Sequence, residues 1–160
     1  MTQPSFEHLA RYNPKANTAD FHLPIKPRLL NAETGALILP KLIMRNAGQA
    51  NAGYFNAVAR ANAKTGQMRR IAQGRIDAEM VERNRQQDVQ LFPRHVIEGW
   101  EGIYDSNGNA VEFNADNCTA FLAALPPWIM DEIRNFAAVP ANFLGEDELA
   151  AEDVEETAKN

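Results

Sequence analysis

The residues of this chain that could do chemistry are few, and they lie far apart in the sequence. Cys118 is the single cysteine, and His8, His22 and His95 stand in three separate segments. A nucleophilic thiol needs a base within hydrogen-bond reach, and a zinc site needs several cysteine or histidine ligands at short spacings. Neither pattern is present, so the sequence predicts no catalytic residues, no metal site, no cofactor and no enzymatic activity.

The acidic and thiol groups fit structural roles. Asp131 and Glu132 are neighbours on a predicted helix, where adjacent side chains point about 100° apart, so they do not form an acid/base pair. We interpret them as charges of the first helical turn. Cys118 lies on an apolar stripe, and we interpret it as a small buried hydrophobic residue.

A basic stretch in the middle of the chain is the one feature that suggests nucleic acid. Four acidic residues interrupt it and dilute its field, so the sequence favours a solvated helix face and no nucleic-acid partner. The basic residues are Arg69, Arg70, Arg75, Arg83 and Arg85.

The length and charge distribution of the chain indicate what kind of fold must position these residues. A chain of 160 residues with 45% hydrophobic content can bury one core without metals or disulfides. Residues 146–160 hold seven acidic residues and one lysine, and the rest holds 15 of the 16 basic and 14 of the 21 acidic residues, a balance of +1. We find no secretion signal and no membrane span, and expect a soluble protein of a reducing cytoplasm.

The first 47 residues contain five of the nine prolines and are predicted to be extended. The alternating run 21–25 and the apolar run 36–39 are expected to pair as a hairpin around a turn at 33–35. We therefore divide the chain into an extended Pro-rich segment, residues 1–47, a helical domain, residues 48–145, and a flexible acidic tail, residues 146–160.

Four helices are predicted in the central domain. The first covers 51–63, with Asn51 as its N-cap, and the second covers 75–91, ending at Pro93 unless that proline begins a short helix over 94–98. Asn114 caps the third, whose stripe consists of Cys118, Phe121, Leu122 and Leu125, and the fourth begins at Pro126-Pro127 with an inward stripe of Ile129, Ile133, Phe136 and Ala137.

Between the second and third helices, Asn107-Gly108 predicts a tight turn within a small β-hairpin over 100–113. Ile103, Val111 and Phe113 would share its buried face. We expect Trp100 in the core and leave Trp128 open between core and interface. The fold class is thus mainly α (α+β), with about four helices, a small hairpin and a strand-like N-terminal segment.

Several short motifs occur in an order that resembles tailed-bacteriophage tail assembly chaperones. The resemblance covers about residues 45–144 and leaves out the Pro-rich segment and the acidic tail. Its motifs are Asn51-Ala-Gly-Tyr54, the basic segment from Arg70 to Glu79, Gly99-Trp-Glu-Gly102, Asp105-Ser-Asn-Gly108 with Val111-Glu-Phe113, and Asn142-Phe143.

The resemblance implies a late, non-enzymatic protein of virion morphogenesis that acts in the cytoplasm of the infected host cell. Such a protein binds the tape measure protein, keeps its apolar helices soluble and recruits tail tube protein subunits; homo-oligomer formation is left open. We place the expected partner-binding surface at Tyr54, Val58, Trp128 and Phe136.

Two other functions remain as alternatives. A structural virion protein, such as a minor capsid, neck or tail component, would use the Pro-rich segment as an arm across a neighbouring subunit. A small nucleic-acid-binding regulator would use the basic stretch and would bind DNA with a steep salt dependence.

Overall fold

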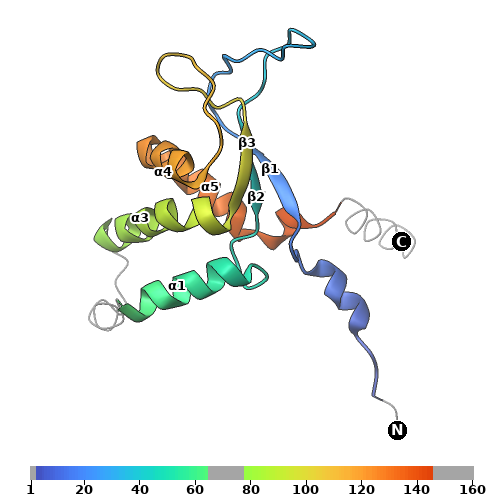
Figure 1. The fold of residues 1–160 in the computed structure, drawn as a ribbon. Helices are drawn as coiled ribbons and strands as arrows, with labels where there is room; N and C mark the ends of the chain where they lie inside the picture. Colours follow the sequence, from blue (N-terminus) through green and yellow to red (C-terminus); the bar gives the residue numbers. More distant parts are fainter. Residues whose placement is uncertain (1–2, 65–77, 146–160) are drawn as a thin grey trace.

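The computed structural model describes residues 3–64 and 78–145 and combines a small antiparallel sheet with helices on one of its faces (Figure 1). This confirms the predicted α+β class. In chain order the elements are η1 (Glu7–Tyr12), β1 (Thr18–His22), β2 (Lys41–Arg45), α1 (Ala52–Lys64), α3 (Ala78–His95), β3 (Ile97–Glu101), α4 (Ala115–Ala124), α5 (Pro127–Ala138) and η2 (Pro140–Phe143).

The three strands are ordered β1-β2-β3, so β2 is central and both its neighbours are antiparallel to it. Leu42 of β2 lies opposite Phe21 on one side and Trp100 on the other. Because side chains alternate along a strand, Leu42 and Met44 share a face, and both are 0% exposed. The other face is polar: Lys41 pairs with Asp20 at 2.9 Å.

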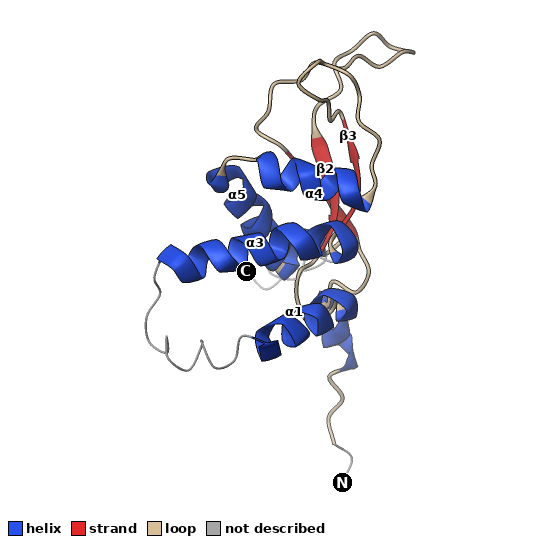
Figure 2. Cartoon of the chain, turned by 60° about the vertical axis from the view of Figure 1, so that its left-hand side comes forward, coloured by secondary structure: helices blue, strands red, loops and turns tan. Residues whose placement is uncertain are grey.

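Helices α3, α4 and α5 cover the apolar face of the sheet, and α1 lies beside α3 (Figures 1 and 2). The predicted stripe of α4 is confirmed, since Cys118 and Leu122 are buried and Phe121 packs against the core. The cap of this helix is also confirmed: the Asn114 side chain accepts a hydrogen bond from the amide of Asn117. The largest fully buried side chains are Phe92, Phe143, Leu42, Met44, Leu122, Met130 and Ile133.

The fourth helix likewise begins at the predicted proline pair and buries most of its predicted stripe. Pro127 occupies its first turn, and Ile129, Ile133 and Ala137 are buried. Proline is suited to this position because the first helical amides have no intrahelical partner. Phe136 is half-buried and packs against the core.

The predicted pairing of 21–25 with 36–39 is wrong. β1 pairs with β2, and the segment between them forms only an isolated bridge between Leu30 and Leu37. The run 41–45 was missed because it directly follows Pro40 and has only three consecutive apolar residues, Leu42-Ile43-Met44, between two charged ends, which gives a short and weak strand signal. Strands β1 and β2, from the first 47 residues, share one sheet with β3; the predicted boundary at residue 47 remains a prediction.

Both predictions for Pro93 are wrong. Helix α3 continues through Pro93 to His95, and residues 97–98 belong to β3. Pro93 lies in the last helical turn, where the lost amide disturbs only one intrahelical bond. On this helix Val81 is 38% exposed, whereas Asp88, Val89 and Phe92 are buried. The predicted start at 75–77 lies outside the described residues.

The turn at Asn107-Gly108 is present, although its flanks form a single bridge between Tyr104 and Ala110 rather than two paired strands. Gly108 has a φ of +83°, a conformation that glycine adopts without strain. The strand before the turn, β3, pairs with β2 instead. Ile103 is buried, as expected, and its carbonyl accepts a hydrogen bond from the Val111 amide at 3.0 Å.

Candidate functional site

A polar network joins three helices around one buried carboxylate. Asp88 of α3 is 6% exposed. Its Oδ1 accepts a hydrogen bond from the Tyr54 hydroxyl of α1 at 2.8 Å, and its Oδ2 accepts one from Nε of Arg134 in α5 at 2.7 Å. Burial, followed by the Asp88 carboxylate, raises the pKa of Tyr54, so the phenol stays protonated and remains a donor.

Asp131 extends this network along α5. Arg85 of α3 donates two hydrogen bonds to the two Asp131 oxygens, each at 3.0 Å, and Arg134 lies 3.6 Å from the same carboxylate. The hydrogen bond from Arg85 is the main cause that lowers the pKa of Asp131. Asp131 therefore ties α5 to α3. The prediction that Asp131 and Glu132 belong to the first helical turn is wrong, because the first turn of α5 contains no acidic residue.

A groove lies above this network between α1 and α3. It encloses about 160 Å³ and is lined by Tyr54, Val58, Asn62, Asn84, Gln87, Asp88 and Arg134. We call it the α1–α3 groove. Two exposed apolar side chains lie on the helices that form the groove. Phe55 of α1 is 46% exposed and stands one helical turn before Val58. Val81 of α3 is 38% exposed and stands one turn before Asn84. The groove thus combines a polar floor with apolar positions on both helices.

The structure brings together only two of the four predicted partner-binding residues. Tyr54 and Val58 line the α1–α3 groove. Phe136 instead packs between Phe21 and Phe143, with ring centroids 5.2 and 5.5 Å away, and Trp128 is 55% exposed at the start of α5. Phe136 therefore supports the attachment of β1 and η2, whereas Trp128 is a separate exposed position.

The sequence missed Asp88 and Arg134 as members of this site. Asp88 was counted among the four acidic residues that interrupt the basic stretch, because an acidic residue in a polar helix ordinarily faces solvent. Its two partners stand 34 and 46 residues away in the chain. No local spacing signals such a contact. The helical spacing of Tyr54 and Val58, in contrast, was a usable signal.

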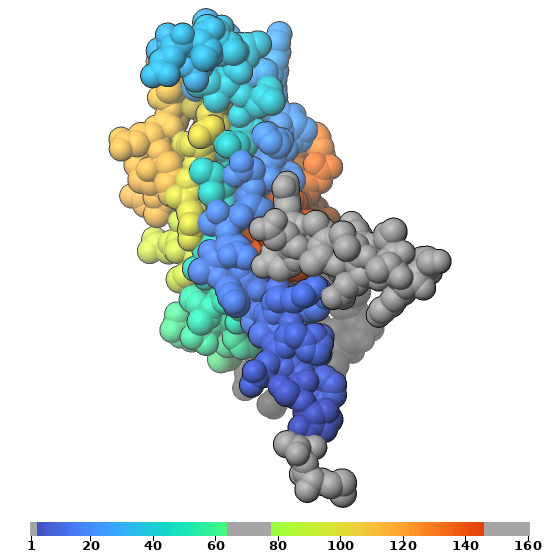
Figure 3. Space-filling model, turned by 90° about the vertical axis from the view of Figure 1, so that its right-hand side faces the viewer, coloured from blue at the N-terminus to red at the C-terminus, as the bar shows by residue number. Residues whose placement is uncertain are grey.

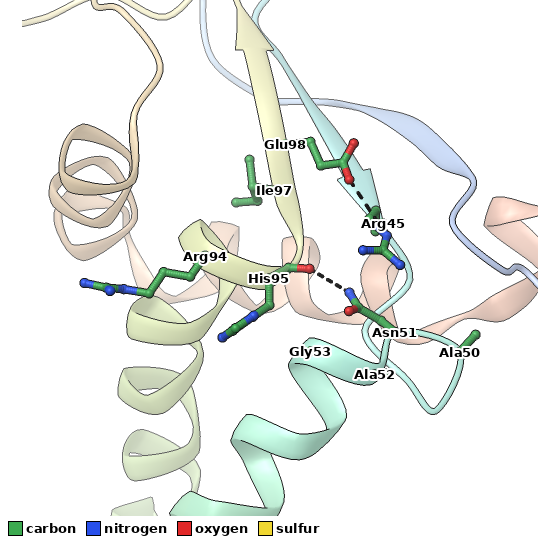
Figure 4. A pocket seen from close by; sticks show the side chains of 9 residues that line it. All are labelled: Arg45, Ala50, Asn51, Ala52, Gly53, Arg94, His95, Ile97 and Glu98. Atoms are coloured by element: carbon green, nitrogen blue, oxygen red, sulfur yellow. Dashed lines mark hydrogen bonds and ion pairs between the residues drawn. The ribbon is translucent and has the colours of Figure 1, made fainter.

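A second pocket, of about 300 Å³, lies where the end of α3 meets the start of α1 (Figure 4). The Asn51 side chain, 2% exposed, donates from Nδ2 to the carbonyl of His95 at 2.6 Å, and its Oδ1 accepts from the Tyr54 amide at 3.3 Å. Asn51 therefore caps α1 and also fixes it to α3. Arg45 and Glu98 line the same pocket, with Nε of the arginine 3.8 Å from the carboxylate.

A third pocket, of about 410 Å³, lies at the base of the long segment between β1 and β2, which we call the arm, residues 24–40. Leu29, Ile38, Trp100, Ile103 and Val111 supply its apolar wall. Leucines 30, 37 and 39 of the arm are 63%, 54% and 58% exposed. The arm forms the top of the molecule, in light blue to cyan, in Figure 3.

Cys118 sits in the core and away from these pockets. It is 0% exposed, and burial raises the pKa of its thiol to about 12, which leaves it protonated at neutral pH. Among the described residues, no group of three or more histidine, cysteine or acidic side chains lies close enough together to hold a metal ion. Within the same residues, no helix is both long and apolar enough to cross a bilayer.

The fold and these surfaces define a small α+β protein with a three-stranded sheet, helices on one face and a polar-floored groove between α1 and α3. The family model described as YdaY prophage protein matches residues 49–160, well over half of the chain, and the chain belongs to this family. It is accordingly a phage-derived protein. No curated protein and no solved structure matches the chain.

The matched span begins after β2 and so contains α1, α3, β3, α4, α5 and η2. All residues that line the α1–α3 groove fall within it. The arm and the first two strands lie outside it. The groove is therefore a feature of the part of the chain that carries the family signature.

Proposed function

We propose that this prophage protein is a tail assembly chaperone that binds the tape measure protein, keeps it soluble and recruits tail tube subunits during tail morphogenesis. It acts without an enzymatic step, in the cytoplasm of the host cell. The prophage family and the order of the short motifs from Asn51 to Phe143 support this proposal. The observation that carries it is the α1–α3 groove, with exposed apolar side chains on the two helices that form it.

A partner helix with apolar residues on one face fits such a groove. Val58 of the lining offers apolar contact, and Phe55 and Val81 are exposed apolar side chains of the two helices that form the walls. Asp88 and Arg134 are already paired with each other, so the floor accepts a partner without leaving a charge unpaired. In such interfaces a few side chains carry most of the binding energy, so single substitutions in the groove are informative.

The test is co-expression with the tape measure protein of the same prophage, followed by affinity capture of the chaperone. Tyr54→Ala, Phe55→Ala and Val58→Ala should each weaken retention of the partner by about tenfold, as expected for interface side chains worth about 1.4 kcal/mol. Phe6→Ala is the matched control, because Phe6 is 64% exposed and belongs to the N-terminal segment, far in sequence from the residues that line the groove.

Far-ultraviolet circular dichroism of each variant separates lost binding from lost fold. If all three groove variants remain folded and retain the tape measure protein as well as Phe6→Ala does, the groove is not the binding surface. Trp128→Ala and Phe136→Ala complete the set of expected residues. We expect Trp128→Ala to leave the fold intact, and Phe136→Ala to loosen β1 and η2.

A second candidate function is a structural component of the virion. The exposed leucines of the arm favour it, because three such side chains on one protrusion are suited to contact with a neighbouring subunit. Mass spectrometry of purified particles distinguishes the two functions. A virion component is present in finished particles in a fixed stoichiometry, whereas an assembly chaperone is absent from them.

Binding of nucleic acid has less support. Arg85 is occupied by Asp131 and Glu82, and Arg83 lies 3.7 Å from Glu79. Arg69, Arg70 and Arg75 lie outside the described residues. The described part of the basic stretch is therefore an ion-paired helix face.

A further inference from the structure

The pocket in Figure 4 has more hydrogen-bond donors than acceptors among the residues that line it. We call it the Arg45 pocket, and its lining is formed by Arg45, Ala50, Asn51, Ala52, Gly53, Arg94, His95, Ile97 and Glu98. Three elements meet there: the end of β2, the start of α1 and the end of α3. A volume of about 300 Å³ accommodates one or two polar side chains of a binding segment.

Arg45 is the donor left without a hydrogen bond. Its Nε is shielded from solvent and has no hydrogen-bond partner within the described chain. Glu98 is the nearest acid, at 3.8 Å, which is an ion pair but too long for a hydrogen bond, and half of the Glu98 side chain is exposed. A shielded donor without an acceptor is costly. The Arg45 side chain as a whole is 25% exposed, so its guanidinium can pair with a carboxylate that enters the pocket.

The backbone adds two donors. Ala52 and Gly53 open α1 and line the pocket, and their amides find no acceptor in the described residues. His95 adds its imidazole, since Nδ1 lies 3.1 Å from where a Cβ on Gly53 would stand. Arg94 contributes positive charge at the rim, although its side chain extends away from Arg45 (Figure 4). The lining contains one acidic residue, Glu98, compared with these donor and cationic groups.

The chain itself contains a segment of complementary charge. Residues 146–160 carry seven acidic side chains and one lysine. They follow directly on Gly145, which is eight residues beyond Ala137, and the carbonyl of Ala137 accepts hydrogen bonds from the Asn46 side chain at 2.7 Å and the Ala47 amide at 2.8 Å. Those two residues come immediately after Arg45. A 15-residue segment spans up to about 50 Å when extended, so the pocket is within reach.

We propose that the Arg45 pocket binds carboxylates of residues 146–160 of the same chain. Attachment to one chain gives the segment an effective concentration in the millimolar range, which permits occupancy by weak ion pairs. The contact covers the start of α1, the helix that forms one wall of the α1–α3 groove. The acidic segment thereby gains a defined place on the folded domain, independent of which partner fills the groove.

The test compares amide spectra of the ¹⁵N-labelled full chain with those of a full chain in which the seven acids of residues 146–160 are replaced by their amides. Neutralising the segment should shift the resonances of Ala52, Gly53 and His95 and leave those of the distant turn around Gly108 in place. About 1 M NaCl should reproduce the change in the unmodified chain, since screening then acts over about 3 Å.

Arg45→Gln in the full chain should produce shifts at Ala52 and Gly53 and abolish any further effect of neutralising the segment. Arg60→Gln is the matched control, because it removes an exposed arginine of α1 that does not line the pocket. Arg45→Lys keeps the charge and should retain part of the effect. Dispersed spectra with unchanged core resonances verify that each variant is folded.

Three results would overturn the proposal. The first is that the pocket resonances stay unchanged when the segment is neutralised. The second is that neutralisation still shifts them in Arg45→Gln, which places the contact elsewhere. The third is that the shift fades on dilution of the protein, which assigns it to contact between two copies. If a glutamate-rich peptide shifts the pocket resonances of the neutralised chain while neutralisation itself does not, the natural carboxylate comes from another protein, and the assignment to this segment fails.

Discussion

The two carboxylate oxygens of Asp88 accept hydrogen bonds from different helices, Tyr54 of α1 and Arg134 of α5. Asp88→Ala leaves the Tyr54 hydroxyl and part of the Arg134 guanidinium without a partner in a shielded place. We expect the free energy of unfolding to fall by about 3 kcal/mol, measured by urea denaturation. Asp88→Asn keeps an acceptor for Tyr54 and should cost less.

Glu132→Ala is the matched control for this prediction. Glu132 is an exposed acid on α5, next to the network but with no part in it, so its removal should change stability by less than about 0.5 kcal/mol. Equal effects of the two substitutions would mean that the network contributes nothing beyond an ordinary surface charge.

Cys118 makes a pH-dependent contribution whose sign follows from its burial. Its pKa is raised from the ordinary 9.0 to about 12 in the folded chain. Between about pH 9 and pH 12 the unfolded chain loses the thiol proton while the folded chain keeps it. Stability is therefore unaffected below pH 9 and falls above it, by at most about 1.4 kcal/mol per pH unit.

The comparison that isolates this effect is denaturation of the unmodified chain and Cys118→Ala across that pH range. Tyrosine and lysine residues titrate in both proteins, so only the difference in slope belongs to the thiol. Parallel stability curves would contradict the prediction. Ellman's reagent gives an independent readout: the thiol should react readily after unfolding and very slowly before it.

At the level of single residues, burial of apolar side chains was predictable and polar contacts were not. Cys118 was predicted as a buried hydrophobic residue because its helical neighbours are apolar at regular spacing. Asp88 has no such neighbours in sequence; its burial depends on Tyr54 and Arg134, which the fold brings from distant helices. The helical spacing predicted that Tyr54 and Val58 share a face of α1, whereas the contacts of Asp88 with distant helices could not be predicted.

Two helices begin with an asparagine cap, and their different surroundings give a prediction at the level of elements. Asn114 caps α4 by accepting from the Asn117 amide. Asn51 caps α1 and also donates to the His95 carbonyl. Serine preserves a cap but lacks the amide donor. Asn51→Ser should destabilise the protein by about 1–3 kcal/mol, because a buried carbonyl loses its partner, and Asn114→Ser by less than about 0.5 kcal/mol.

Amide hydrogen exchange locates the effect. In Asn51→Ser, protection should fall mainly in α1, which depends on this bond for its attachment to the end of α3. A uniform loss of protection across all helices would contradict this, because it would mean that α1 unfolds only together with the core. Loss of protection in α4 alone would point to an indirect effect.

Helices were predictable where the full repeat of apolar residues lies within one continuous segment of the sequence. Helices α4 and α5 show full stripes and proline or asparagine at their starts, and their bounds follow these signals. Strand pairing depends on segments far apart in the chain, and the pairing of β1 with β2 crosses the whole arm. Helix α3 ran through Pro93 because packing of Phe92 and Val96 into the core outweighs one lost backbone bond.

For the molecule as a whole, the matched family span and the folded unit have different limits. The span starts at residue 49, whereas the central strand of the sheet is β2, residues 41–45. Leu42 and Met44 of this strand are both 0% exposed and lie in the same cluster as Phe92 and Ile133. The helices of the family span thus pack on a strand that precedes it.

A chain reduced to residues 49–160 should therefore not fold cooperatively. It lacks β1 and β2, which leaves β3 without its partner strand and exposes the apolar face of the helices. Loss of two fully buried apolar side chains alone costs roughly 4–10 kcal/mol, comparable to the whole stability of a domain this size. Thermal unfolding followed by circular dichroism should show a broad transition, and amide spectra should lose dispersion.

Removal of residues 1–12 is the control, since it deletes η1, which contains no buried residue, and leaves the sheet intact. That protein should keep a sharp transition close to the unmodified one. A cooperative transition in the 49–160 chain would show that the helices form a core without the sheet, and would support a boundary at residue 47. We expect the opposite, because the face that α3, α4 and α5 share is completed by Leu42 and Met44.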